Sequence, residues 1–261
     1  RLLIDADCAI ESGSIDRLAR LCLETGRPVQ ALDLMHARAG AGLKTQIAEF
    51  AWLVKNHVRA LGYHRLGLPC QLMGTGMGFP WTVIVKASLA SGDLVEDLKL
   101  GIDAACVGTP ALFCPEALVT SNFPATADGI ANQRTRWEHG HLGVMLLTVP
   151  QLFLQGLRGR DRNLLALALD LCVPPLALLL MLVLTVFVGS AAFFVLTTLA
   201  LPLCLAGVSL AMLGLSILFA WLRYGRQVIS LGSLAYAPIY ALWKIPLYLK
   251  FLVKRQAEWV R

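Results

Sequence analysis

Two acidic residues near the start of the chain have a spacing that could support chemistry on a phosphate group. Asp5 and Asp7 are separated by one alanine and follow a short apolar run. Two carboxylates at the carboxyl end of a strand can bind a hard divalent cation, which in turn bridges a diphosphate. Two solvated acids in a turn would show the same pattern, so this pair alone does not identify a site.

A second acidic pair could act on a hydroxyl group. Glu96 and Asp97 lie in the first turn of a segment with helical periodicity, residues 95–105. The helix dipole stabilises a carboxylate at this position, and such a carboxylate can accept a proton as a general base. Acids at a helix start are also common as plain partners of the dipole, which remains the alternative interpretation.

A third group of functional side chains lies on a helix predicted over residues 126–147. Gln133, Arg136 and Trp137 fall within about one helical turn. Arginine can hold phosphate oxygens, and an indole can stack on the apolar face of a sugar ring. A charged interfacial helix with a tryptophan anchor at a membrane would use the same residue types.

The order of these groups is more specific than any one of them. A glycine-rich loop, Gly74-Thr75-Gly76, lies between the two acidic pairs, and apolar segments follow the third group. This order resembles that of the family 2 glycosyltransferases, which include cellulose, chitin and hyaluronan synthases and ceramide glucosyltransferase. The resemblance covers residues 1–140, and the apolar tail agrees with it.

The resemblance implies an α/β fold, a partial GT-A nucleotide-sugar-binding domain followed by C-terminal transmembrane helices. It implies that Asp7 binds Mg²⁺ or Mn²⁺, and that Asp97 is the general base. The donor, a UDP-sugar or another nucleotide sugar, would lie against Asp5, Gln133 and Arg136. The acceptor would lie against Trp137, Glu96, Gly74, Thr75 and Gly76.

The resemblance also implies inversion at the anomeric carbon, because one base and no enzyme nucleophile give a β-linkage from an α-linked donor. We expect a growing polysaccharide as the acceptor, with a possible export partner protein; a single transfer to a lipid is the alternative. A transporter would carry polar sites within the membrane, and a non-catalytic scaffold would have lost Asp7, Asp97 or Trp137. Both are therefore disfavoured.

The composition predicts a membrane protein. Hydrophobic residues make up 57% of the chain, and the mean hydropathy is +0.64. Between residues 164 and 222 the only charged side chain is Asp170. Residues 164–188 and 191–222 are each long enough to span a bilayer, with a proline pair that should kink the first. Residues 228–253 could form a third span or lie in the interface.

We therefore expect a catalytic domain at residues 1–140, an interfacial transition at 141–163, a membrane region at 164–253 and a basic tail at 254–261. The net charge of +6 gathers beside the apolar segments, which favours contact with membrane lipids and a cytoplasmic catalytic domain on a multi-pass protein. No basic-aromatic motif supports binding to nucleic acid. The sequence begins within a strand and lacks an initiator methionine, so we expect an N-terminally truncated fragment.

Overall fold

The core of the protein is a mixed five-stranded sheet. The computed structural model describes residues 1–85, 95–124 and 126–253 of the 261 residues. The strand order is β1-β4-β3-β5-β2, and only β3 and β5 pair in parallel. The strands are β1 (Leu2–Leu3), β2 (Ala9–Ile10), β3 (Val29–His36), β4 (Met77–Gly78) and β5 (Leu112–Asn122).

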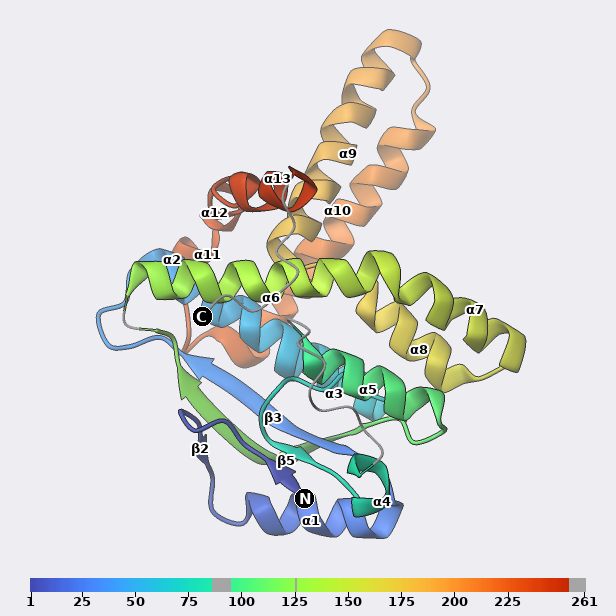
Figure 1. The fold of residues 1–261 in the computed structure, drawn as a ribbon. Coiled ribbons are helices and arrows are strands. Elements are labelled where there is room, and N and C mark those ends of the chain that lie inside the picture. The colour runs from blue at the N-terminus through green and yellow to red at the C-terminus, as the bar shows by residue number, and fades with distance from the viewer. Residues whose placement is uncertain (86–94, 125, 254–261) are drawn as a thin grey trace.

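Helices cover both faces of this sheet (Figure 1). Helix α1 (Ser14–Thr25), which has the bounds that its periodicity predicts, packs on one face against Ala31 and Val119. The other face is covered by further helices, and there Leu32 and Phe113 belong to a separate apolar cluster. Neighbouring residues of a strand point to opposite faces, so β3 contributes to both clusters.

Strand β5 replaces the two short strands that its sequence predicts. It pairs with β3 from Val29↔Leu112 to His36↔Asn122, but the register shifts where Ala31 pairs with Cys114 and Leu32 pairs with Leu118. Pro115 lies within the shift, and proline has no backbone N–H to donate to the ladder. The strand continues past this bulge because residues 118–122 resume the pairing with β3.

One long helical segment carries several side chains toward the sheet. It consists of α2 (Leu43–Leu53), a π-helical turn η1 (Val54–Arg59) and α3 (Ala60–Arg65). Gly62 does not end the helix, contrary to the prediction from sequence. The backbone continues to Arg65, because a single glycine weakens a helix without breaking it.

Four helices connect the sheet to the apolar tail. They are α5 (Glu96–Cys106), α6 (Ala127–Leu147), α7 (Val149–Gly159) and α8 (Arg162–Leu171), and the short α4 (Trp81–Ile84) precedes them. Helix α6 is capped by the hydroxyl of Thr126, which accepts from the backbone N–H of Gly129. Helices α5, α7 and α8 share one apolar cluster that includes Ile102, Leu152 and Leu167.

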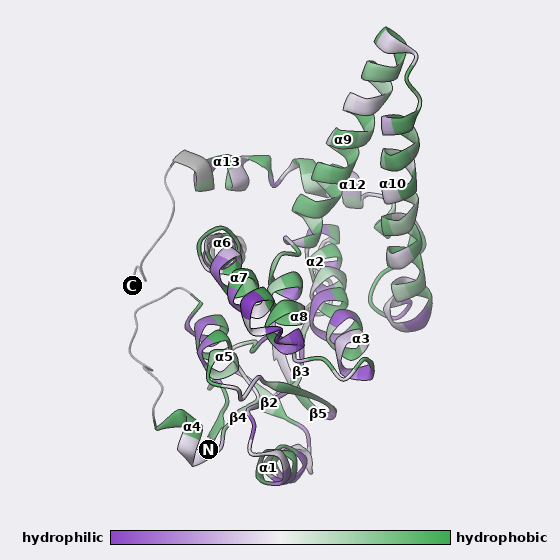
Figure 2. Cartoon of the chain, turned by 90° about the vertical axis from the view of Figure 1, so that its right-hand side faces the viewer, coloured by the Kyte–Doolittle hydropathy of each residue, from purple (hydrophilic) through white to green (hydrophobic). Residues whose placement is uncertain are grey.

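The apolar tail forms a helical hairpin that projects away from the sheet (Figures 1 and 2). Its helices are α9 (Leu176–Thr197) and α10 (Leu201–Ala220), the second continuing through η2 (Trp221–Gly225). Both are long and apolar enough to cross a membrane, with hydropathies of 2.7 and 2.3. By length and composition alone, the bent pair at 132–147 and 149–159 would be a third candidate. The mixed α/β core and this hairpin confirm the predicted fold class.

The predicted boundaries of the membrane segments need correction. Residues 164–171 belong to α8, whose Leu167 and Leu171 are buried against α5 and α7. Pro174 and Pro175 break the helix instead of kinking it, so the first candidate span begins at Leu176. The second begins at Leu201 and not near residue 191, because the chain turns at 198–200.

The third predicted segment, residues 228–253, does not form one helix. Within it the structure has only short helices: α11 (Leu231–Leu234), α12 (Ala237–Leu242) and α13 (Ile245–Val253). Prolines at 238 and 246 lie in the first turns of α12 and α13, where they are tolerated, and they prevent a continuous helix. The predicted basic tail, 254–261, lies outside the described residues.

Gly76 and Gly26 give a matched test of packing around the glycine-rich loop. Both have a positive φ, +65° and +64°, but a Cβ on Gly76 would lie 2.8 Å from Val119 Cγ2 and 2.9 Å from Ala31 Cβ, whereas nothing lies within 4 Å at Gly26. Gly76→Ala should therefore destabilise the protein by roughly 1–3 kcal/mol more than Gly26→Ala. Thermal unfolding in detergent measures both variants, and equal losses would contradict the crowding.

Candidate functional site

The first acidic pair lies in an exposed turn after β1. The ligand atoms of Asp5, Asp7 and Cys8 all lie within 4.8 Å of one another. Carboxylates suit a hard cation such as Mg²⁺ or Mn²⁺, whereas a protonated thiol does not. Burial raises the pKa of the Cys8 thiol, so it remains protonated at neutral pH. The two carboxylates therefore fit the metal that the sequence implies, and the cysteine does not add to the ligand set.

The glycine-rich loop joins this turn to the second acidic pair. The hydroxyl of Thr75 accepts from the backbone N–H of Asp5 at 3.1 Å. A Cβ on Gly74, whose φ is +95°, would lie 3.5 Å from Asp97 Oδ2, so the loop backbone lies directly against that carboxylate. Glycine suits both requirements, a left-handed conformation and a close approach.

Strand β3 holds the loop in place. The side-chain amide of Gln30 donates to the carbonyl of Thr75 at 2.8 Å and accepts from the backbone N–H of Met73 at 2.8 Å. The backbone N–H of Ala31 donates to the carbonyl of Gly76, also at 2.8 Å. Gln30 is fully buried, so these bonds form where water cannot replace them.

Asp97 lies at the start of α5, partly buried beneath the neighbouring helices. Burial raises the pKa of its carboxyl group, and the ammonium of Lys55 opposes that rise. Burial in turn lowers the pKa of Lys55, and the neighbouring Arg59 adds to this effect. Glu96, the other member of the pair, is exposed.

Helix α6 presents its predicted residues to two different neighbours. Partial burial and the charge of Asp7 raise the pKa of Asp5, and the positive charge of Arg136 lies close enough to oppose this effect. The ring of Trp137 instead lies 4.9 Å from the ring of Trp52 on α2, at an interplanar angle of 39°. Gln133, one turn earlier, is half-buried.

Sequence reasoning missed a buried polar group at the base of the site. Asp33 on β3 is 2% exposed, and the amide of Asn56 donates to its carboxylate at 3.1 Å. Burial raises the pKa of Asp33 to about 7; nearby Asp5 and Asp97 also raise it, while Lys55 lowers it. Asp33 is the single acid in strand β3, and that was the available signal.

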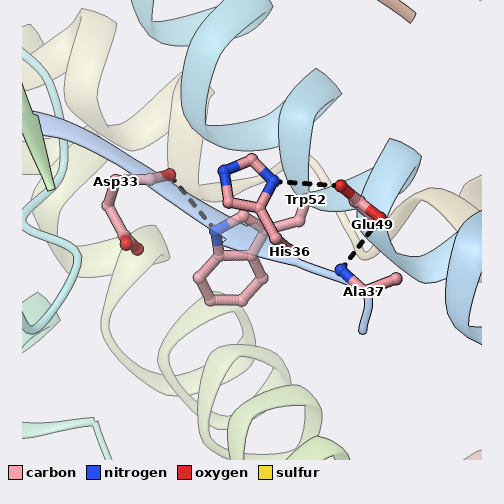
Figure 3. A network of polar contacts seen from close by, with 5 residues as sticks. All are labelled: Asp33, His36, Ala37, Glu49 and Trp52. Carbon is pink, nitrogen blue, oxygen red and sulfur yellow. Dashed lines mark hydrogen bonds and ion pairs between the residues drawn. The ribbon is translucent and has the colours of Figure 1, made fainter. Parts of the chain in front are cut away.

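The helical segment at 43–65 fixes this strand through several hydrogen bonds. The indole N–H of Trp52 donates to the Asp33 carbonyl at 3.2 Å (Figure 3). At the end of the strand, Glu49 accepts from the Ala37 backbone at 3.0 Å and pairs with His36 at 3.1 Å (Figure 3). Residues 52, 55 and 56 share one helix face by their spacing, which is a pattern that the sequence does contain.

Asp170 on α8 stabilises the same helical segment at 43–65. Its carboxylate lies 3.0 Å from Arg59 Nε and accepts from the amide of Gln71 at 2.6 Å. It is 4% exposed, on α8. The one acid of the apolar stretch at 164–222 is therefore part of the folded core beneath the site, and not a polar residue within a membrane span.

The structure thus brings part of the predicted set together, namely Asp5, the glycine-rich loop, Asp97 and Arg136. The backbone of Asp5 is bonded to the loop, the loop lies against Asp97, and the charge of Arg136 acts on Asp5. Trp137 lies nearby on α6 and, with Trp52, lines a cavity of about 470 Å³. Phosphate, hydroxyl and sugar chemistry can therefore be combined at one site.

Comparison with known proteins identifies the family. The sequence model of the family described as Glycosyl transferase family group 2 matches residues 2–253. No curated protein matches the chain. Since the family match extends from the first strand through the last described helix, the chain belongs to glycosyltransferase family 2 and is a glycosyltransferase.

Proposed function

We propose that this protein is a membrane-bound, inverting glycosyltransferase that moves a sugar from a nucleotide-diphosphate donor to an acceptor hydroxyl group. The observation that carries the proposal is the glycine-rich loop, which lies against Asp97 and bonds to the backbone of Asp5. A leaving-group site and a proton acceptor that share one rigid loop have a fixed separation. Such preorganisation is a major source of enzymatic rate enhancement.

The donor's diphosphate binds between α6 and the exposed turn that contains Asp5 and Asp7. Asp7 holds the divalent cation, and Asp5 lies beside the nucleotide of a UDP-sugar or a related donor. The guanidinium of Arg136 and the amide of Gln133 donate hydrogen bonds to the phosphate oxygens. When bound, Mg²⁺ or Mn²⁺ supplies positive charge that stabilises the departing diphosphate.

Asp97 is the general base. The acceptor oxygen forms a bond to the anomeric carbon while the bond from that carbon to the diphosphate oxygen breaks, and the hydroxyl proton passes to the Asp97 carboxylate. Attack from the face opposite the leaving group inverts the configuration. The raised pKa of Asp97 makes it a stronger base than an exposed aspartate.

The acceptor binds to Trp137, to the loop at 74–76 and to the exposed Glu96. An indole face can stack on a pyranose ring, as a growing polysaccharide requires, or can cover the head of a lipid. A polymer product would also require an export partner protein. A polysaccharide acceptor and a lipid acceptor require different side chains around them in the part of the site beyond Trp137.

The hairpin α9–α10 anchors the enzyme as a multi-pass membrane protein. Basic residues flank it at both ends, Arg158, Arg160 and Arg162 before it and Arg223 and Arg226 after it. The excess of arginine on both flanks favours a cytoplasmic location for both, and hence for the catalytic part. The catalytic part includes α7 and α8 beyond residue 140, because Asp170 is paired with Arg59 beneath the site.

Asp97→Asn should lower kcat by roughly 10²- to 10⁴-fold, since general-base catalysis contributes about that much. Release of UDP from UDP-sugars in the presence of Mn²⁺ measures turnover, and calorimetric titration with UDP measures donor-site binding, which should survive. Asp103→Asn is the matched control, an exposed aspartate on the same helix. Preserved turnover in Asp97→Asn would show that another group takes the proton.

The pH dependence of kcat should report on Asp97. Activity rises with pH as this carboxyl loses its proton, and its raised pKa places the acid limb above the ordinary value of 3.8. Lys55→Met removes the ammonium that lowers the pKa of Asp97. The pH range in which activity increases should therefore move upward in this variant. Lys44→Met is the control, because Lys44 lies over the Trp243 ring, 3.7 Å from its centroid. A limb unmoved in Lys55→Met would contradict this coupling.

Removal of metal should mimic the loss of Asp7. EDTA should abolish sugar transfer by the wild-type enzyme, and added Mn²⁺ should restore it. In Asp7→Ala, added Mn²⁺ should no longer increase the affinity for UDP, measured by calorimetric titration. Asp16→Ala, at an exposed acid in the first turn of α1, should behave as wild type. Full Mn²⁺ dependence in Asp7→Ala would overturn the ligand assignment.

A further inference from the structure

A cavity of about 470 Å³ extends from the tryptophan pair to the base of the membrane hairpin. This volume lies within the range of roughly 300–1,000 Å³ that is typical of sites for small ligands. Its wall comes from the helical segment at 43–65, from α6 and from the starting and ending turns of the hairpin at α9 and α10. It therefore lies where the catalytic part meets the candidate membrane spans.

The end of the cavity nearest the hairpin is lined by aliphatic side chains in three helical stripes. Each stripe has a spacing of four residues, which places its members on one helix face. The stripes are Val54 and Val58, Leu176 and Leu180, and Leu213 and Ile217. An aliphatic wall offers water no hydrogen-bond partners, so a ligand that fills this end must itself be apolar.

Another part of the cavity wall is aromatic and polar. Trp52 and Trp137 lie here with their ring centroids 4.9 Å apart, and Lys55 lies beside them. Lys55 is also the residue whose charge acts on Asp97. A ligand that spans the cavity would therefore place its polar end beside Lys55, whose charge acts on Asp97, and its apolar end toward the membrane hairpin.

Three cations of the cavity wall already have partners. Arg59 pairs with Asp170 at 3.0 Å, and Lys244 forms an ion pair with Glu138. Arg134 donates to the hydroxyl of Tyr240 at 2.8 Å. The charges of Arg59 and Lys244 are thus compensated by carboxylates, and in the proposed function the polar end of the ligand must carry the hydroxyl group that Asp97 deprotonates.

We infer that the acceptor is a hydroxyl-bearing membrane lipid whose alkyl chain occupies this cavity, with the hydroxyl directed past Trp137 toward Asp97. The inference rests on the proposed function and adds the class of its acceptor. A polysaccharide chain would require hydroxyl, amide or carbonyl groups along its path, and the aliphatic stripes provide none of these. The inference therefore commits to the lipid, which the sequence left as the alternative acceptor to a polysaccharide.

Ser216 and Ser209 on α10 offer a matched pair of variants. Both hydroxyls donate to the carbonyl four residues earlier, Ser216 at 2.8 Å and Ser209 at 3.0 Å. Ser216 lines the cavity and Ser209 is exposed elsewhere on the same helix. A phenylalanine at 216 should obstruct the apolar part of the cavity, and the same substitution at 209 should leave it open.

The binding test uses the full chain in nanodiscs with a long-chain alcohol that carries a diazirine near its tail. Illumination should label peptides of α9 and α10, unlabelled alcohol should compete, and cellotetraose should not. Ser216→Phe should reduce the labelling about tenfold, as expected for a blocked apolar site, whereas Ser209→Phe should retain it. Equal labelling in the two variants would overturn the site.

The product test supplies radiolabelled UDP- and GDP-sugars together with total membrane lipid. We expect the label to enter the chloroform–methanol phase as one sugar per lipid, in a reaction that Ser216→Phe suppresses. A polymeric product that still depends on Asp97 contradicts the lipid acceptor alone. Transfer that is unaffected by Asp97→Asn, with lipid labelling intact, contradicts the proposed catalytic role alone.

Discussion

The site depends on one ammonium group placed among carboxylates. Lys55 acts electrostatically on Asp33, Asp97 and Asp170, which come from a strand, a helix start and a distant helix. Removing charges from water is costly unless opposite charges compensate, so this lysine and these acids constrain one another. The result is that the fold around Asp97, the proposed base, sets its proton affinity. The sheet, α5 and α8 must all be in place for that balance to hold.

Helix α6 carries neighbouring residues that act on the acidic turn and on the apolar cavity. Arg136 acts toward the acidic turn, and its neighbour Trp137 packs on Trp52 at the cavity. Adjacent residues on a helix point about 100° apart, so one turn can serve a diphosphate on one side and an acceptor on another. In the proposed mechanism, this geometry would let a short motif contact both substrates.

Local periodicity predicted the elements that pack a single apolar face against one neighbouring part of the fold. The bounds of α1 followed from apolar spacing, and the extent of α6 agrees with the helix predicted over residues 126–147. The start of the first span did not, because Leu167 and Leu171 are as apolar as membrane residues yet pack against α5 and α7. Hydropathy measures the preference for leaving water and does not say whether lipid or protein replaces it.

The candidate residues of the site were predicted from their order along the chain, whereas Asp33, Lys55 and Asn56 were not. Their roles arise from contacts between β3 and η1 that lie 20 or more residues apart in sequence. A lone acid in a strand and a lysine on a helix are common, and only their burial together distinguishes them here. Tertiary contact, not residue type, therefore supplied this part of the site.

The π-helical turn at η1 spans residues 54–59 and divides the long helix into two α-helical parts. A wider turn accommodates one extra residue, and each residue advances a helix by about 100°. The wider turn absorbs this residue locally, so Trp52 before it and Ala60 after it keep their orientations toward the aromatic pair and the sheet. Removing or adding one residue in either regular α-helical part would instead rotate every later side chain by about 100°. The π-helical turn is therefore the part of this helix that can take up a change in length.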